Sequence, residues 1–175
     1  MTDKLYDMDW GLESCTAEVL ECRAAEGCYE VLLSDTVIFP EGGGQPCDLG
    51  RIGKANVLHA REDGDNVWHL VDAQLKPGLR VEVVLDAVRR RDHSCQHTGE
   101  HIVSGLSKRL FDANNVGFHM AEDYSTLDLD KFLEQDELIR LELEANRAVR
   151  KNIPVRLQIT DAEGLNGLQL RKQAA

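Results

Sequence analysis

The chain has 175 residues, of which 42% are hydrophobic and 29% are charged, so it is long enough to bury a core in one domain or two small ones. Its net charge of −11 argues against broad, nonspecific binding to nucleic acid, although basic clusters in the second half leave room for a local basic track. No run approaches the roughly 18 apolar residues of a membrane span, and without a signal architecture at the N-terminus we expect a cytoplasmic protein with no membrane partner.

The N-terminal part, residues 1–91, has the pattern of short strands separated by turns. Alternating or short apolar runs predict strands at residues 17–23, 28–33, 55–59, 67–71 and 80–85. The apolar run 37–39 leads into a loop rich in proline and glycine. Many short strands at this spacing favour a small barrel or a folded sheet.

From Asp92 onward, the pattern changes to helices mixed with strands. A first helix is expected at about 94–111, capped by Asp92 or Ser94. A second helix is expected at about 134–151, and it is predicted to bury Leu138, Leu141, Ala145 and Val149. Further strands are expected at 117–120, 125–129 and 155–159, followed by a last helix capped by Asp161. The predicted fold class is α+β, with one domain at 1–91 and a second at 92–175.

The segment His97-Thr98-Gly99-Glu100-His101 places two imidazoles four positions apart in the first predicted helix. Residues at this spacing share a helix face, where two neutral imidazoles can bind one divalent metal ion. A zinc site needs a third and usually a fourth ligand. The segment also fits the His-x-x-Glu-His pattern of an inverted zinc peptidase, in which Glu100 would be the general base and Glu142 or Glu144 a substitute ligand.

A second motif, residues 39–46, reads Phe-Pro-Glu-Gly-Gly-Gly-Gln-Pro. Three successive glycines let a backbone approach a ligand closely or adopt positive φ values. Gln45 adds a side chain that both donates and accepts hydrogen bonds. The motif is not a phosphate-binding P-loop, because no Gly-Lys-Ser/Thr follows it. Gly42, Gly43, Gly44 and Gln45 are therefore a candidate substrate-binding loop, and a plain turn between strands is the alternative.

Together, the two motifs resemble the alanyl-tRNA editing family, the free-standing relatives of the editing domain of alanyl-tRNA synthetase. The resemblance extends to residues 115–120, 126–130 and 144–146, so it covers almost the whole chain. It implies an N-terminal β-barrel that resembles a translation-factor domain, followed by an α+β editing domain that holds zinc.

The resemblance also implies an activity in translation fidelity. Members of the family hydrolyse the ester bond of tRNA(Ala) that wrongly carries serine or, in some cases, glycine. A zinc ion can lower the pKa of a water molecule and polarise the ester carbonyl. By this resemblance His97 and His101 are two zinc ligands, and the glycine-rich loop borders the amino-acid pocket, which places Gln45 near the substrate. Gln45 and Glu100 are the candidate catalytic residues, and the role of Glu100 stays open between orienting a ligand and facing solvent. The expected partner is mischarged tRNA(Ala).

The sequence departs from the family pattern at its C-terminal end. The family's other two zinc ligands come from a Cys-x-x-x-His motif, and this chain stops at Ala175 before any such motif. We therefore expect a truncated chain with an incomplete editing domain and a weak zinc site, unless His119 supplies a ligand, or Cys95 does so from an irregular helix start. Two alternatives stay open: a noncatalytic module that binds tRNA or a protein, and the zinc peptidase.

Overall fold

The structure, a computed structural model, describes residues 1–155 and Gly164. The strand predicted at 155–159 and the helix predicted after Asp161 therefore lie almost entirely outside the described residues. The chain divides into two compact units, one made of Met1–His97 and Phe118–Thr126, the other of Thr98–Gly117 and the residues from Leu127 onward.

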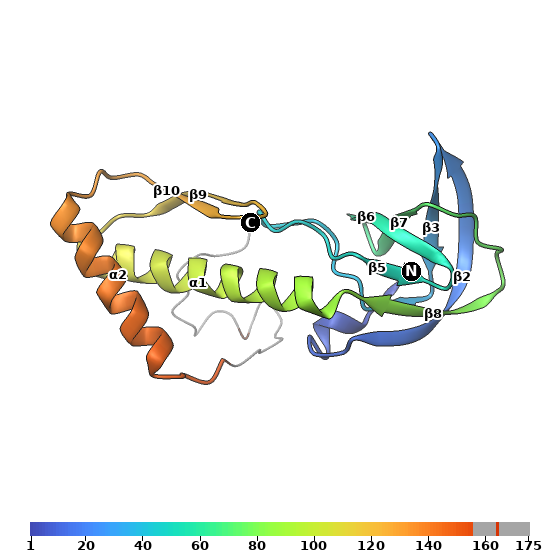
Figure 1. Ribbon diagram of the computed structural model, residues 1–175, viewed down its shortest axis with the longest axis horizontal. Helices are drawn as coiled ribbons and strands as arrows, with labels where there is room; N and C mark the ends of the chain where they lie inside the picture. Colours follow the sequence, from blue (N-terminus) through green and yellow to red (C-terminus); the bar gives the residue numbers. More distant parts are fainter. Residues whose placement is uncertain (156–163, 165–175) are drawn as a thin grey trace. The chain divides into compact units, whose positions relative to one another are not determined.

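Strands dominate the first unit (Figure 1). Its elements before the first long helix are β1 Asp3–Lys4, the 3₁₀ helix η1 Leu5–Asp7, β2 Ser14–Ala25, β3 Cys28–Leu33, β4 Asp35–Thr36, β5 Gly50–Ile52, β6 Ala55–Asp63, β7 Asn66–Val71 and β8 Arg80–Leu85. Six of the strands close into a barrel in the order β2-β3-β7-β6-β5-β8. The two short strands β1 and β4 pair in parallel outside it.

The pairing of β2 with β8 shows how the sequence pattern builds this barrel. Ala17 pairs with Val81, and both side chains are buried, as are those of Val19 and Val83 one pleat further along their strands. Because successive side chains of a strand point to opposite faces, the polar residues between them face outward. The period-2 pattern in the sequence therefore fixes which face of each strand joins the core.

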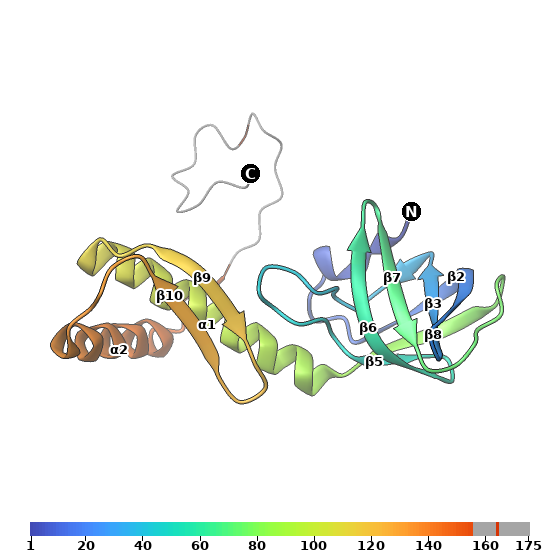
Figure 2. The same ribbon diagram turned by 90° about the horizontal axis from the view of Figure 1, so that it is seen from above.

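The second unit packs two helices and part of a hairpin around a smaller core. Its elements, some shared with the first unit, are α1 Ala87–Phe111, β9 Asn115–Met120, β10 Ser125–Leu129 and α2 Gln135–Arg150. Figure 2 shows β9 and β10 running side by side as a hairpin. The buried core of this unit consists of Leu106, Phe111, Ala113, Leu133 and Leu141.

The structure bears out the fold class and several of the strands expected from the sequence. The α+β class is confirmed, and the predicted strands 28–33, 80–85 and 125–129 match β3, β8 and β10. The division between residues 91 and 92 stays a prediction, as does the likeness to a translation-factor domain; residues 91 and 92 both lie within α1. None of the helices in the described part of the chain is long and apolar enough to cross a membrane.

Two predictions about the helices were wrong. Helix α1 begins at Ala87, not near Ser94, because Asp86 caps it: its Oδ1 accepts a hydrogen bond from the Arg89 backbone N–H at 3.0 Å. In α2 only Leu141 of the four expected core residues is fully buried, whereas Leu138 is 44% exposed and Val149 is 61% exposed.

Candidate functional site

The glycine-rich loop forms a tight turn whose shape explains its glycines. Gly42 and Gln45 each donate a backbone hydrogen bond to the other's carbonyl, at 3.1 and 3.0 Å. The two central residues, Gly43 and Gly44, have φ values of 61° and 82°. Positive φ at both central positions defines a type I′ turn, which glycine adopts without steric cost. The turn therefore presents Gln45 on a fixed backbone.

Gly44 also lies directly against strand β9 within the first unit. A Cβ atom at this position would come 2.6 Å from the carbonyl oxygen of Phe118. The Gly44 carbonyl accepts a hydrogen bond from the Met120 N–H at 3.2 Å. No side chain fits between the loop and the strand, so the glycine is required for the loop to reach this place.

Gln45 connects the loop to the histidine motif. Its side chain is 7% exposed, and its Oε1 lies 2.8 Å from Nδ1 of His97. An amide oxygen can only accept, so His97 donates this hydrogen bond and its proton lies on Nδ1. The lone pair of the ring is then on Nε2, the form in which an imidazole binds a metal ion. The ring of His97 also packs near that of Phe118, with centroids 5.6 Å apart.

Glu100 is held by its own set of partners on the next turn of α1. Its Oε1 accepts hydrogen bonds from Asn115 Nδ2 at 2.6 Å and from the Ser104 hydroxyl. Its Oε2 lies 3.0 Å from Nδ1 of His101. The Glu100 side chain is 4% exposed, whereas that of His101 is 59% exposed. A carboxylate beside Nδ1 favours the tautomer that leaves Nε2 of His101 as the ligand atom.

His97, Glu100 and His101 form one group whose potential ligand atoms lie within 4.8 Å of one another. The two imidazole nitrogens are donors that zinc accepts, so the residues present fit two of the three or four ligands of a zinc site, with the Glu100 carboxylate beside them. His119, the predicted substitute ligand, is exposed on β9 and is not in the group, and neither is the exposed Cys95. Both ligand assignments stay predictions.

A buried ion pair fixes the start of α1 to the loop segment. Arg90 donates from Nε to Oδ2 of Asp48 at 2.9 Å and from Nη2 to the Val37 carbonyl at 2.6 Å. The side chains of Asp48 and Arg90 are 0% and 8% exposed. Asp48 Oδ2 also accepts from the Phe39 N–H at 2.8 Å, at the base of the glycine-rich loop. Helix and loop are therefore joined at two points, Arg90–Asp48 and His97–Gln45.

The histidine one turn before the motif behaves differently. His93 is buried, and burial, followed by the Arg89 guanidinium, lowers the pKa of its ring. The ring is therefore neutral near pH 7. It has the i, i+4 spacing to His97, but it does not belong to the group of potential metal ligands.

No family model matches the chain. The chain does match individual proteins, among them several named alanyl-tRNA editing proteins. It is 36% identical over 132 residues to the alanyl-tRNA editing protein Aarsd1-A of Xenopus laevis, which covers 75% of this chain and 32% of that protein. It is 34% identical to mouse Aarsd1 over 149 residues, or 81% of this chain and 36% of the relative. The alanyl-tRNA editing protein AlaX-L of Pyrococcus horikoshii is 31% identical over 169 residues, or 92% of this chain and 42% of the relative.

The chain belongs to the alanyl-tRNA editing protein family. This confirms the family indicated by the glycine-rich loop and the histidine motif. The chain spans about a third of the length of the animal editing proteins that it matches, and 42% of the archaeal one.

Sequence reasoning about this editing-family chain found both motifs but missed the residues that support them. Ser104 lies four positions after Glu100 on α1, a helical spacing that was available in the sequence. Asn115 and Phe118 lie in a stretch that resembles the family, but nothing in the sequence shows that they contact Glu100 and His97.

Proposed function

We propose that this chain carries the catalytic centre of an aminoacyl-tRNA hydrolase that removes serine or glycine from mischarged tRNA(Ala). The observation that carries the proposal is the hydrogen bond between Gln45 of the glycine-rich loop and His97 of the metal-ligand group. It brings together the two motifs on which the family resemblance rests. The relatives, each named an alanyl-tRNA editing protein, support the tRNA(Ala) part of the proposal.

In this proposal, His97 and His101 are the residues that would hold a zinc ion. Bound zinc supplies a water of lowered pKa, about 7, and polarises the ester carbonyl. An aminoacyl ester is already activated, so the protein's own contribution is to hold the ligands and the substrate in place. The type I′ turn at Gly43 and Gly44 does this for the loop, since it fixes the backbone that carries Gln45.

Gln45 and Glu100 act as positioning residues. The Oε1 atom of Gln45 accepts a hydrogen bond from the Nδ1–H of His97, and the Glu100 carboxylate lies against Nδ1 of His101. Both side chains are buried, so each holds its imidazole in one tautomer and one orientation. Removing such a partner typically lowers metal affinity by about 10–100-fold.

The surroundings of Glu100 favour this role over that of a peptidase base. A general base must lie within hydrogen-bond reach of the water that it deprotonates. Glu100 is 4% exposed, and its two oxygens already face Ser104, Asn115 and His101. The proposed deacylation needs no proton transfer to Glu100. It is therefore compatible with a Glu100 carboxylate whose oxygens already contact Ser104, Asn115 and His101.

The test measures zinc content and deacylation of Ser-tRNA(Ala), Gly-tRNA(Ala) and Ala-tRNA(Ala), in this chain and in the longest protein that its gene encodes. We expect one zinc per active protein and faster hydrolysis of the mischarged esters. His97→Ala and His101→Ala should lose zinc and activity together. His119→Ala tests whether His119 is a further ligand, and His59→Ala, which removes a partly exposed imidazole of β6 outside the group, is the matched control.

Variants of Gln45 separate positioning from simple space-filling. Gln45→Ala should weaken zinc binding by about 10–100-fold. Gln45→Glu keeps an oxygen acceptor for the His97 Nδ1 proton and should retain most of the affinity. If zinc-loaded protein hydrolyses none of the three esters, the hydrolase proposal is wrong. If it cleaves correctly charged Ala-tRNA(Ala) as fast as the mischarged esters, the editing role is wrong.

A further inference from the structure

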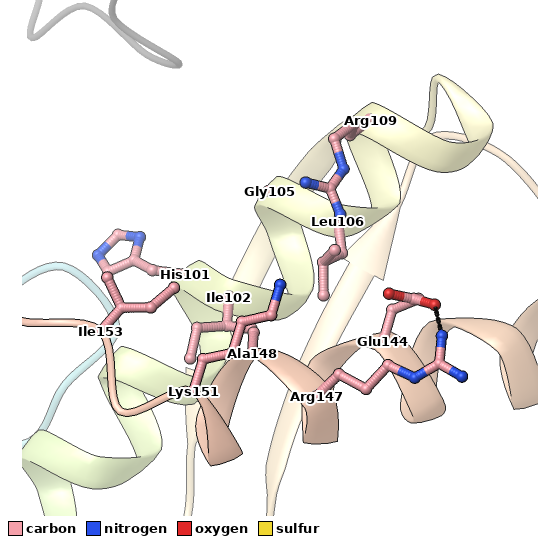
Figure 3. A pocket seen from close by; sticks show the side chains of 10 residues that line it. All are labelled: His101, Ile102, Gly105, Leu106, Arg109, Glu144, Arg147, Ala148, Lys151 and Ile153. Atoms are coloured by element: carbon pink, nitrogen blue, oxygen red, sulfur yellow. Dashed lines mark hydrogen bonds and ion pairs between the residues drawn. The ribbon is translucent and has the colours of Figure 1, made fainter.

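A groove between α1 and α2 opens next to the candidate metal ligands. Its volume is about 380 Å³, and all its lining residues belong to the second unit. It is lined from α1 by His101, Ile102, Gly105, Leu106 and Arg109, and from α2 and the residues after it by Glu144, Arg147, Ala148, Lys151 and Ile153 (Figure 3). His101 is thus both a candidate zinc ligand and one end of the groove.

The groove concentrates positive charge in an otherwise acidic chain. Three cations line it (Arg109, Arg147 and Lys151) against one carboxylate, that of Glu144, in a chain with a net charge of −11. Glu144 is paired with Arg147. Among the described residues, neither Arg109 nor Lys151 lies in an ion pair with a carboxylate. Their charges are therefore available to an anionic ligand.

The side chains also suit a ligand that is partly flat and apolar. Figure 3 shows the Lys151 side chain and the Arg109 guanidinium pointing into the space between the helices. Ile102, Leu106 and Ile153 supply apolar lining, and Leu106 is 7% exposed. A positively charged groove that follows the phosphate backbone is one common feature of sites for single-stranded nucleic acid, and here aliphatic side chains line it in place of the usual aromatic stacking surfaces.

The length of the groove agrees with a short single strand. Arg109 follows His101 by eight residues on α1, which is about 12 Å at 1.5 Å per residue. At an axial rise of 3.4 Å per nucleotide in one strand, this corresponds to about three stacked nucleotides. A strand that ends at His101 would pass Arg109 and Lys151 with its preceding phosphates.

We propose that this groove binds the single-stranded 3′ end of the tRNA, with phosphates on Arg109 and Lys151 and the terminal ester at His101. The inference rests on the proposed hydrolase function, because it takes the substrate ester to lie at the metal ligands. It adds the path of the substrate and the residues that hold it. Arg109 and Lys151 are binding residues with no part in the bond cleavage itself.

The test measures binding of uncharged tRNA(Ala) by fluorescence anisotropy, so it does not depend on hydrolysis. Arg109→Ala and Lys151→Ala should each weaken binding by about threefold to tenfold and should reduce the slope of log affinity against log salt by about 0.7 for each lost phosphate contact. Zinc content should be unchanged in both variants. Arg150→Ala is the control, since it removes an exposed cation next to Lys151 that does not line the groove.

A second tRNA identifies which part of the ligand the groove holds. With tRNA(Ala) that lacks its unpaired 3′ nucleotides, the wild-type protein should bind less tightly and the two variants should no longer differ from it. The inference is overturned if the variants weaken both tRNAs equally, or if Arg150→Ala has an effect as large as theirs. It is also overturned if the variants lower the melting temperature without changing tRNA binding, since another part of the protein would then occupy the groove.

The same data keep this inference separate from the proposed function. Loss of the 3′-end effect in a protein that deacylates Ser-tRNA(Ala) would refute only the groove. A retained 3′-end effect in a zinc-loaded protein without deacylase activity would refute only the hydrolase.

Discussion

The three glycines of the loop offer a graded test of how the loop is held against β9. Each can be replaced by alanine, which adds one Cβ atom at three successive positions. At Gly42 the φ angle is not positive and the added Cβ meets no atom within 4 Å. At Gly43 φ is 61° and the nearest atom is Cε1 of His97 at 4.0 Å. At Gly44 φ is 82° and the Cβ would lie 2.6 Å from the Phe118 carbonyl oxygen.

These differences set the expected size of each effect. Gly42→Ala should change the free energy of unfolding by less than about 0.5 kcal/mol, as for an ordinary surface substitution. Gly43→Ala brings only the strain of the left-handed backbone, about 1–2 kcal/mol. Gly44→Ala brings the same strain and also a collision with backbone that must shift, which adds about 1–3 kcal/mol. Gly42→Ala should therefore be the most stable of the three variants, Gly43→Ala the next and Gly44→Ala the least stable.

Thermal unfolding and zinc titration measure the series. At about 2–4 °C per kcal/mol, the melting temperature should fall by about 2–8 °C for Gly43→Ala and by about 4–20 °C for Gly44→Ala. Zinc affinity should fall with Gly44→Ala, because displacing the loop removes Gln45 from His97. Equal effects of Gly43→Ala and Gly44→Ala would refute the close contact between Gly44 and Phe118.

Two further predictions concern the first unit. Burial lowers the pKa of His69 to about 4, below the value of about 6.5 in an unfolded chain, so between these pH values the unfolded state binds one more proton than the folded state. The free energy of unfolding should therefore fall by about 3 kcal/mol from about pH 6.5 to about pH 4. Urea unfolding at several pH values measures this fall, which should be absent in His69→Gln. Arg90→Leu leaves the Asp48 carboxylate buried without its partner and should cost about 3–5 kcal/mol in the same assay, whereas Lys108→Ala, at an exposed pair, should cost less than about 1 kcal/mol.

The parts of the fold that the sequence predicts well are those set by local pattern. Strands β3 and β8 follow from alternation and from the turns beside them. The start of α1 was wrong because Asp92 and Ser94 both resemble local helix caps, and the actual cap, Asp86, was not among the predicted caps. In the structure Asp86 caps the helix, and Arg90 in its first turn contacts the buried Asp48, a residue 42 positions away that local pattern does not reveal.

The candidate site was predictable in its motifs and not in its contacts. The spacing of His97 and His101 on a helix is local, and it placed both residues correctly on α1. The contacts that support the site come from elsewhere in the chain: Gln45 is 52 residues from His97, and Asn115, which donates to Glu100, is 15 residues from it. No periodicity links residues across such separations, so the contacts of Gln45 with His97 and of Asn115 with Glu100 could be seen only in the structure.

The two joints between α1 and the loop segment are seven residues apart, which is close to two helical turns. One extra residue between Arg90 and His97 would turn the imidazole by about 100° around the helix axis and away from Gln45. Outward-facing positions in this stretch can change identity freely, but the number of residues in it cannot change by one. The number of residues between Arg90 and His97, rather than their identity, therefore keeps the His97 ring next to Gln45.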